Sequence, residues 1–81
     1  MFMKNVIVYS TETCPYCVLV KDYLKEKGIT YAEKNVGTDL AAREEMMKKA
    51  SAMSVPVVDI DGTIILGFDK TKINQALGIV E

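Results

Sequence analysis

The fold is indicated most clearly by residues 4–28, which read KNVIVYSTETCPYCVLVKDYLKEKG. Residues 4–10 form a short, continuous apolar run rich in β-branched side chains, which predicts a buried strand. A polar stretch follows, and residues 14–27 then predict a helix with Pro15 in its first turn and Gly28 just after its end. The segment therefore predicts a strand, a short loop and a helix, with two cysteines where the helix begins.

The rest of the chain alternates between apolar runs and amphipathic stretches. Asp61-Gly62 lies between two runs rich in β-branched residues, which is a strong β-hairpin signal. The first strand–helix–strand unit is expected to be right-handed with parallel strands. The other expected elements are a strand at 29–36, a helix capped by Thr38 or Asp39 that ends near residue 51, strands at 55–60 and 63–66, and a helix capped by Asp69. The predicted fold is α/β with the order βαβαββα, a four-stranded mixed sheet with helices on both faces. This is the thioredoxin-like architecture, in a single domain over residues 1–81.

Helical periodicity predicts which side chains the first and last helices bury. The first helix should bury one face, made of Cys17, Val20 and Leu24 with Tyr23 beside them. The last helix should turn a second apolar set inward: Ile73, Ala76, Leu77 and Val80.

The second helix contains a less regular apolar pattern. Its expected inner residues are Leu40, Met47 and Ala50. Methionines 46, 47 and 53 are interpreted as adaptable core filler rather than as a sticky binding surface. Two ion pairs of spacing i,i+4 are expected on its outer side: Glu44 with Lys48, and Glu45 with Lys49.

Composition restricts the classes of function. The 81 residues carry a net charge of −1, with 49% hydrophobic and 26% charged residues, as in an ordinary globular domain. A chain without overall positive charge has no field that attracts nucleic acid or acidic membranes. No stretch approaches the ~20 apolar residues of a membrane span, and no early segment resembles a secretion signal. We therefore expect a monomeric cytoplasmic protein that binds neither nucleic acid nor membrane.

The chain has two cysteines and no histidine. A bridge across two intervening residues closes too small a loop to stabilise a fold, so a chemical role is expected. Two thiols without histidine cannot complete the usual Cys/His tetrahedral zinc site within one chain. A CxxC at a strand-to-helix junction of a βαβ unit is typical of a redox dithiol. The alternative is a pair of buried, inert cysteines, against which the polar loop before Cys14 argues.

The spacing of Cys14 and Cys17 suits reversible disulfide formation, because residues i and i+3 share a helix face. Cys14 lies at the helix start, where unpaired N–H groups and the helix dipole favour an anion. Its pKa should therefore lie well below the usual thiol value of ~8.5. Cys17, one turn further on, should be more buried and remain protonated. We expect Cys14 to attack the substrate disulfide and Cys17 to resolve the resulting mixed disulfide.

The motif Cys14-Pro15-Tyr16-Cys17 is similar to the dithiol motif of glutaredoxins. Thioredoxins usually have Trp before the first cysteine and Gly-Pro inside the motif, whereas this chain has Thr13 and then Pro15-Tyr16. Ser54-Val55-Pro56 resembles the Thr-Val-Pro segment of glutaredoxins, and Gly67 precedes the last helix as a glycine does in glutaredoxins. The resemblance spans the whole chain. It implies a thiol–disulfide oxidoreductase without a bound cofactor, reduced by glutathione and acting on disulfide-containing or glutathionylated proteins.

The resemblance also implies substrate-binding residues, beginning with Pro15 and Tyr16 inside the motif. An X–Pro bond is cis in only ~5–6% of cases, but in this fold the equivalent proline is cis and faces the dithiol. A cis Val55-Pro56 bond would present the backbone N–H and C=O of Val55 to an extended peptide or glutathione. Tyr16 is either a cover for the dithiol and substrate or an exposed loop aromatic. Lys21 either adds positive potential near the dithiol or is a solvated side chain.

The segment Gly67-Phe68-Asp69-Lys70 departs from the common glutaredoxin pattern. Members that bind glutathione well usually carry Gly-Gly and one or two Asp residues here, and a Lys just before the dithiol, where this chain has Glu12. Gly67-Phe68 instead resembles redoxins that serve ribonucleotide reductase and are recharged by thioredoxin reductase. Lys70 and the backbone N–H groups of residues 70 and 71 still offer donors to an anion, with Asp69 as a substrate contact or a plain helix cap.

Three functions remain open from the sequence. The first is a dithiol glutaredoxin. The second is a dedicated electron carrier, recharged by a flavoprotein thioredoxin reductase and serving ribonucleotide reductase or a peroxidase. The third is an iron–sulfur carrier with the cluster held between two chains by Cys14 and glutathione; Pro15 argues against it, because cluster-holding members usually have Gly there. Since the usual acidic pair for the glutathione amino group is incomplete, we expect glutathione to reduce this protein less efficiently than a typical glutaredoxin.

Overall fold

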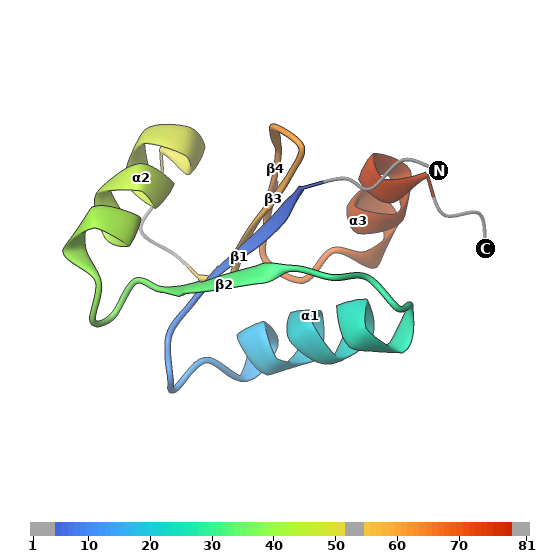
Figure 1. Cartoon of the computed structure of the whole chain (residues 1–81), viewed down its shortest axis with the longest axis horizontal. Helices are drawn as coiled ribbons and strands as arrows, with labels where there is room; N and C mark the ends of the chain where they lie inside the picture. The colour runs from blue at the N-terminus through green and yellow to red at the C-terminus, as the bar shows by residue number, and fades with distance from the viewer. Residues whose placement is uncertain (1–4, 52–54, 79–81) are drawn as a thin grey trace.

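The elements of the fold follow the predicted order. The computed structural model describes residues 5–51 and 55–78. The elements are β1 (Val6–Ser10), α1 (Pro15–Glu26), β2 (Ala32–Asn35), α2 (Leu40–Ala50), β3 (Val57–Ile60), β4 (Thr63–Leu66) and α3 (Lys70–Leu77) (Figure 1). The βαβαββα prediction is confirmed, and the main difference is β2, which is shorter than the expected strand at 29–36.

The sheet is mixed, in the order β2-β1-β3-β4. β1 is parallel to β2, and β3 is antiparallel to both β1 and β4. Asp61 and Gly62 both have positive φ, 51° and 97°, as a two-residue hairpin turn between twisted strands requires. The predicted α/β architecture, with helices on both faces of a four-stranded sheet, is therefore confirmed.

One end of this sheet collects the segments that matter for function. Tyr9 pairs with Val57, and Val57 with Leu66. Pro56 therefore lies beside the end of β1, from which the loop to the first cysteine departs. Gly67 follows β4 at the same end, and its N–H donates to the carbonyl of Pro56 at 2.9 Å.

Helices α1 and α3 pack on one face of the sheet and α2 on the other. Successive residues of β1 point to opposite faces, so this strand contributes side chains to both cores. Val6 and Val8 lie in the core under α1 and α3, whereas Tyr9 lies in the core under α2. The predicted inner face of α1 is confirmed: Cys17, Val20, Tyr23 and Leu24 are buried. In α3, Ile73 is buried and Ala76 and Leu77 pack against the same core; Val80 lies outside the described residues.

The predicted inner face of α2 was wrong for Leu40 and Met47 and right for Ala50, which packs against the core. Leu40 and Met47 are 71% and 43% exposed, and the buried residues are instead Ala42 and Met46. Asp39 caps the helix by accepting a hydrogen bond from the Ala42 N–H at 3.1 Å. The i,i+4 row from Ala42 through Met46 to Ala50 then meets the sheet, and its small residues permit close approach. Met46 is core filler as predicted, Met47 is not, and Met53 lies outside the described residues.

The expected outer pair Glu45–Lys49 was also wrong, because both side chains reach the sheet. Glu45 accepts from Lys34 of β2 at 2.8 Å and from the hydroxyl of Tyr9. Lys49 donates to Asp59 of β3 at 2.6 Å and to the Tyr9 hydroxyl at 2.9 Å. With Ala42, Met46 and Ala50 facing the sheet, Glu45 and Lys49 lie at the edges of this buried row, and these contacts follow. They tie α2 to three strands.

Lys49→Met is expected to lower the free energy of unfolding by about 2–3 kcal/mol, because it leaves the carboxylate of Asp59, whose side chain is 10% exposed, without its cation. The exposed Lys48 on the same helix provides the matched control, Lys48→Met, which should change stability by less than about 0.5 kcal/mol. Urea unfolding at neutral pH measures both. Equal effects of the two substitutions would contradict the prediction.

The pH dependence of this contribution has a definite sign. Hydrogen bonds to Asp59 and Tyr9 raise the pKa of Lys49 above its ordinary value. A raised lysine pKa contributes stability that is fully present below the unfolded-state pKa of about 10.4 and is lost as pH rises above it. The difference in free energy of unfolding between Lys49→Met and wild type should therefore be constant from neutral pH to about pH 10 and become smaller above that.

Candidate active site

Cys14 and Cys17 form a disulfide at the start of α1, with their Cα atoms 5.2 Å apart. Cys14 is the N-cap residue, and its sulfur accepts a hydrogen bond from the Cys17 backbone N–H at 3.1 Å. Pro15 follows in the first turn, as predicted. The N-cap position brings the Cys14 sulfur to the positive end of the helix dipole, where an anion is stabilised.

The two sulfurs differ in exposure. Cys14 is half-buried, whereas Cys17 is completely buried against the sheet. An incoming disulfide therefore meets Cys14 first. Tyr16 is 62% exposed and belongs to α1 rather than to a loop, so it lies on the surface beside Cys14. Its exposure agrees with the exposed-aromatic alternative and leaves its ring accessible to a substrate.

The Val55-Pro56 bond is cis, as the glutaredoxin resemblance implied. Pro56 is buried, and Val55 is half-buried beside the loop that leads to the dithiol; Ser54 lies outside the described residues. Val55 and Thr11 line a shallow pocket of about 230 Å³ with Arg43 of α2. The structure therefore brings Val55, Pro56 and Gly67 together at the end of the sheet from which the dithiol loop leaves.

The residues after Gly67 have contacts within the protein. Asp69 is the N-cap of α3 and accepts from the Lys72 N–H at 3.1 Å. Phe68 packs against the core, with its ring 6.0 Å from that of Tyr23 in an edge-to-face arrangement. The Lys70 ammonium lies 5.2 Å from the centre of the Tyr23 ring. The side chain of Phe68 therefore contributes to packing, and the Lys70 ammonium contacts the Tyr23 ring. The substrate contacts that the resemblance implies for Gly67, Phe68, Asp69 and Lys70 stay predictions.

Lys21 forms an ion pair with the sheet rather than standing free in solvent, and its expected effect on the potential near the dithiol stays a prediction. Its ammonium donates to Glu33 of β2 at 2.8 Å, and the hydroxyl of Ser10 donates to the same carboxylate oxygen at 3.0 Å. These two hydrogen bonds hold the pKa of Glu33 below its ordinary value. Sequence reasoning missed Ser10 and Glu33. The available signal was Lys21, four residues after Cys17 and therefore on the same helix face.

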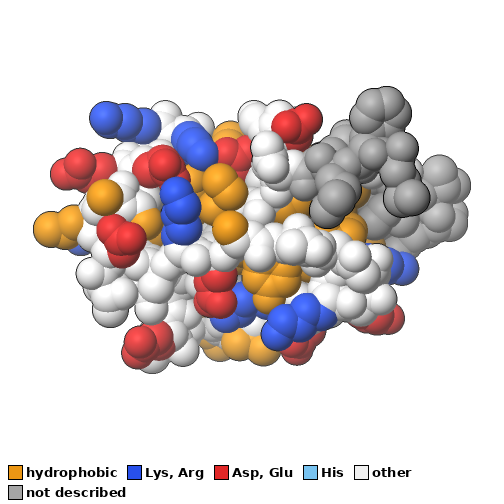
Figure 2. All heavy atoms as spheres, viewed as in Figure 1, with side chains coloured by type: hydrophobic (Ala, Val, Ile, Leu, Met, Phe, Trp, Pro, Cys, Tyr) orange, Lys and Arg blue, Asp and Glu red, His pale blue; other side chains and the backbone are white. Residues whose placement is uncertain are grey.

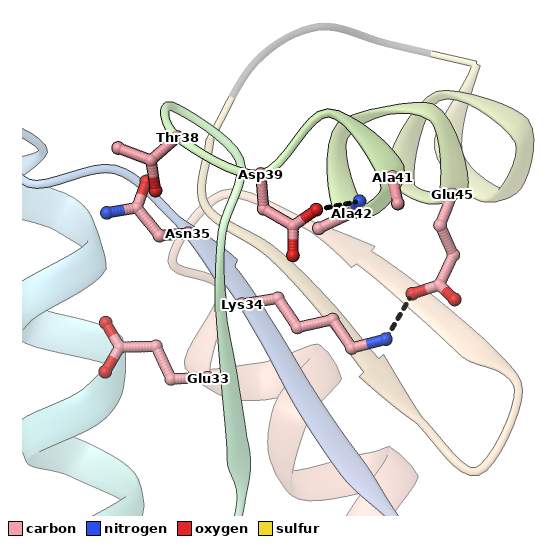
Figure 3. Close-up of a pocket in the computed structure, with 8 residues that line it drawn as sticks. All are labelled: Glu33, Lys34, Asn35, Thr38, Asp39, Ala41, Ala42 and Glu45. Atoms are coloured by element: carbon pink, nitrogen blue, oxygen red, sulfur yellow. Dashed lines mark hydrogen bonds and ion pairs between the residues drawn. The ribbon is translucent and has the colours of Figure 1, made fainter.

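A second pocket lies on the other side of β2, against α2. It is lined by Glu33, Lys34, Asn35, Thr38, Asp39, Ala41, Ala42 and Glu45 (Figure 3). Three of its polar side chains have partners within the protein, since Lys34 pairs with Glu45 and Asp39 caps α2. Within the described residues, no three Cys, Asp or Glu side chains are grouped so that they could hold a metal ion. None of the helices in the described part of the chain has the length and apolar character of a membrane span.

Comparison with known proteins agrees with this geometry. Residues 6–65 match the Glutaredoxin family model. The chain is 46% identical over 70 residues to a glutaredoxin-like 8.6 kDa protein in the rubredoxin operon of Clostridium pasteurianum, covering 86% of this chain and 93% of that protein. It is 42% identical over 76 residues to glutaredoxin 3 of Escherichia coli, covering 94% and 92% of the two chains. Among solved structures, a variant of the thioredoxin-like protein BC3987 superposes with a TM-score of 0.88 at 40% identity, covering 96% of this chain and all of that one. The chain therefore belongs to the glutaredoxin family and is a thiol–disulfide oxidoreductase with a CxxC motif.

Proposed function

We propose that this protein reduces protein disulfides and glutathione mixed disulfides through Cys14 and Cys17, with glutathione as its reductant. The observation that carries the proposal is the asymmetry of the pair. Cys14 is half-buried at the N-terminus of α1, and Cys17 is completely buried one turn away. The reaction needs a compartment in which thiols are kept reduced, and we place the protein in the cytoplasm.

The chemistry proceeds by two exchanges. The Cys14 thiolate attacks one sulfur of the substrate disulfide, which forms a mixed disulfide and releases one substrate thiol after protonation. Cys17 then loses its proton and attacks the Cys14 sulfur, which releases the second substrate thiol and leaves the Cys14–Cys17 disulfide. Two glutathione molecules return this disulfide to the dithiol and leave as glutathione disulfide. No separate base is needed where the attacking thiol has a low pKa.

Substrate binding is assigned to the end of the sheet next to the dithiol. Val55 would offer backbone N–H and C=O groups to an extended peptide or glutathione. Its half-buried position beside Thr11 supports this role. Gly67 would flank the same site, since its N–H is held by Pro56.

A dedicated electron carrier is the second candidate. Two observations favour it: the Gly67-Phe68 segment, and the relative whose gene lies in a rubredoxin operon. Asp69 and Lys70 already have contacts within the protein, which reduces what they can offer to glutathione. In this role a flavoprotein thioredoxin reductase would reduce the disulfide to the dithiol, and ribonucleotide reductase or a peroxidase would oxidise the dithiol again.

The deciding experiment is a coupled assay on a small mixed disulfide, run with two electron sources. We expect turnover with glutathione and glutathione reductase, at a rate below that of a typical glutaredoxin. Each missing charge-assisted hydrogen bond to glutathione costs about one to two decades in affinity. Rapid turnover only with thioredoxin reductase and NADPH would replace the glutaredoxin proposal by the dedicated carrier.

Asp69→Ala tests whether the start of α3 contacts glutathione, with Asp39→Ala as the matched control. Both residues are N-caps that accept a backbone hydrogen bond at 3.1 Å, so both substitutions should cost about 1 kcal/mol of stability. Only Asp69→Ala should also slow turnover with glutathione, by about tenfold for one lost charge-assisted hydrogen bond. Unchanged turnover in both variants would show that Asp69 is a helix cap and nothing more.

A further inference from the structure

One helical turn beyond the buried Cys17, α1 carries Lys21, which belongs to a small charged cluster that the exchange reactions above do not use. The cluster consists of Lys21, Glu33 and Ser10, joined at one carboxylate oxygen of Glu33 by hydrogen bonds of 2.8 Å and 3.0 Å. Ser10 is 1% exposed and Cys17 is completely buried. Each of the three residues comes from a different element, α1, β2 and β1, so the fold itself assembles the cluster.

The topology places this cluster beneath the first turns of α1. Ser10 ends β1, and a four-residue loop leads back into α1, which runs antiparallel to β1 (Figure 1). Glu33 pairs with Val8 in register, so its side chain points to the same face as Val8, toward α1. Lys21 follows Cys17 by one helical turn, and residues four apart on a helix have Cβ atoms about 6 Å apart. Lys21, the cation of the cluster, therefore lies one helical turn beyond Cys17 on the same face of α1.

We propose that the Lys21–Glu33 pair, held by Ser10, sets how strongly the reduced dithiol favours its thiolate form and thereby sets its reduction potential. This rests on the roles assigned above to Cys14 and Cys17. Lys21 and Glu33 act on the cysteines through their charges and take no part in the bonds that form and break at sulfur, so they are positioning residues. The Lys21 charge stabilises a thiolate, and the Glu33 carboxylate offsets most of that effect.

A purely structural role would not account for the arrangement. The side chain of Glu33 is 45% exposed and that of Lys21 is 21% exposed, and an ion pair so open to solvent contributes little to folding stability. The interaction of Lys21 and Glu33 with a thiolate is stronger than their contribution to folding stability. Cys17 and Ser10 exclude water from the side of the pair that faces the core, and burial on one side strengthens electrostatic interactions.

Other charged groups surround the site, among them Arg43 of α2, which lines the pocket with Thr11 and Val55. Lys25 of α1 adds a weaker attraction at Glu33. Glu12 is exposed in the loop before Cys14. Asp69 caps α3, and Lys70 lies over Tyr23. On the face shown in Figure 2, basic and acidic side chains are interspersed.

The proposal predicts opposite shifts for the two single substitutions. Glu33→Gln leaves the Lys21 charge uncompensated, so the thiolate is favoured and the pKa of the attacking thiol should fall by about half a unit to one unit. Lys21→Met leaves the Glu33 carboxylate uncompensated, so the same pKa should rise by a similar amount. The double variant Lys21→Met/Glu33→Gln restores local neutrality and should lie close to wild type.

The reduction potential should follow the thiolate. Stabilising the thiolate stabilises the reduced protein, so Glu33→Gln should be more oxidising and Lys21→Met more reducing than wild type. We expect a three- to tenfold change in the dithiol–disulfide equilibrium constant in each direction, equivalent to about 15–30 mV for this two-electron couple. The change should shrink at high salt, because Glu33 is partly exposed to solvent.

The test measures thiol pKa by ultraviolet thiolate absorbance and the potential in dithiothreitol redox buffers, for the four proteins and for Glu26→Gln. Glu26 is the exposed last residue of α1, about 18 Å along the helix from Cys14, so this matched control should not shift either quantity. Opposite shifts with cancellation in the double variant support the proposal. Shifts in the same direction, or none beyond the control, overturn it.

Neither measurement uses a protein substrate or glutathione. Failure of this inference would therefore leave the assigned roles of Cys14 and Cys17 standing. Those roles are tested by the activities of the cysteine variants.

Discussion

Replacement of Cys14 by serine is expected to abolish reduction of every disulfide substrate, with a loss of about a thousandfold or more. The attacking group in thiol–disulfide exchange is a thiolate, and a serine hydroxyl does not ionise near neutral pH. Cys14 is the half-buried cysteine at the helix N-terminus, and Cys17 has no exposed surface from which to replace it. The chain contains no other thiol.

The measurement is a glutathione-coupled assay on a small mixed disulfide and a turbidity assay on insulin reduction. Urea unfolding of the reduced proteins provides the folding control, since the reduced wild type also lacks the disulfide. Cys14→Ser should unfold close to reduced wild type, because Cys14 is only half-buried. An active Cys14→Ser protein together with an inactive Cys17→Ser protein would reverse the assigned roles.

The order of elements was predictable because each signal is local. The apolar run at Val6–Ser10, Pro15 at a helix start and the Asp61-Gly62 turn each act over a few residues, and the structure contains all three. The handedness of βαβ units then restricts the topology. Strand ends were less predictable: residues 29–31 fit a strand by composition but do not pair with β1, whose register with β2 begins at Ile7 and Ala32.

The rotation of α2 was not predictable from hydrophobicity alone. Leu40 and Met47 are more apolar than Ala42, yet the row that meets the sheet is the one whose small residues permit close approach. The sheet face below α2 also contains polar groups, those of Tyr9 and Asp59, and it therefore attracts Glu45 and Lys49. A pattern that assigns charges to the outer face misses contacts of this kind.

The dithiol was predictable, because the chemistry resides in the spacing of two residues at a helix start. The cis Val55-Pro56 bond was implied only by the family resemblance, since the base rate favours trans. Ser10 and Glu33 could not be placed together without the register of β1 and β2, which pairs residues 25 apart in the sequence. Long-range contacts on an edge strand have no local signal.

Cys17→Ser is expected to separate the two activities. Reduction of a protein disulfide should fall to background, because the mixed disulfide on Cys14 then has no resolving thiol beside it. Removal of glutathione from a glutathionylated substrate should persist within several-fold, since a second glutathione can resolve the mixed disulfide on Cys14. The insulin and small mixed disulfide assays measure the two activities on one preparation.

Because Cys17 is buried, Cys17→Ser is also expected to lower stability, and Cys17→Ala separates that effect from the loss of the thiol. A serine hydroxyl placed in a fully buried site costs about 1–3 kcal/mol where it finds no partner, whereas Cys17→Ala introduces no polar group. Both variants should show the same split between substrates, and both should accumulate a mixed disulfide with insulin that mass spectrometry detects. Loss of both activities in the folded alanine variant would show that glutathione cannot resolve Cys14 from outside. The function would then depend on the complete dithiol, as a carrier recharged by a flavoprotein reductase requires.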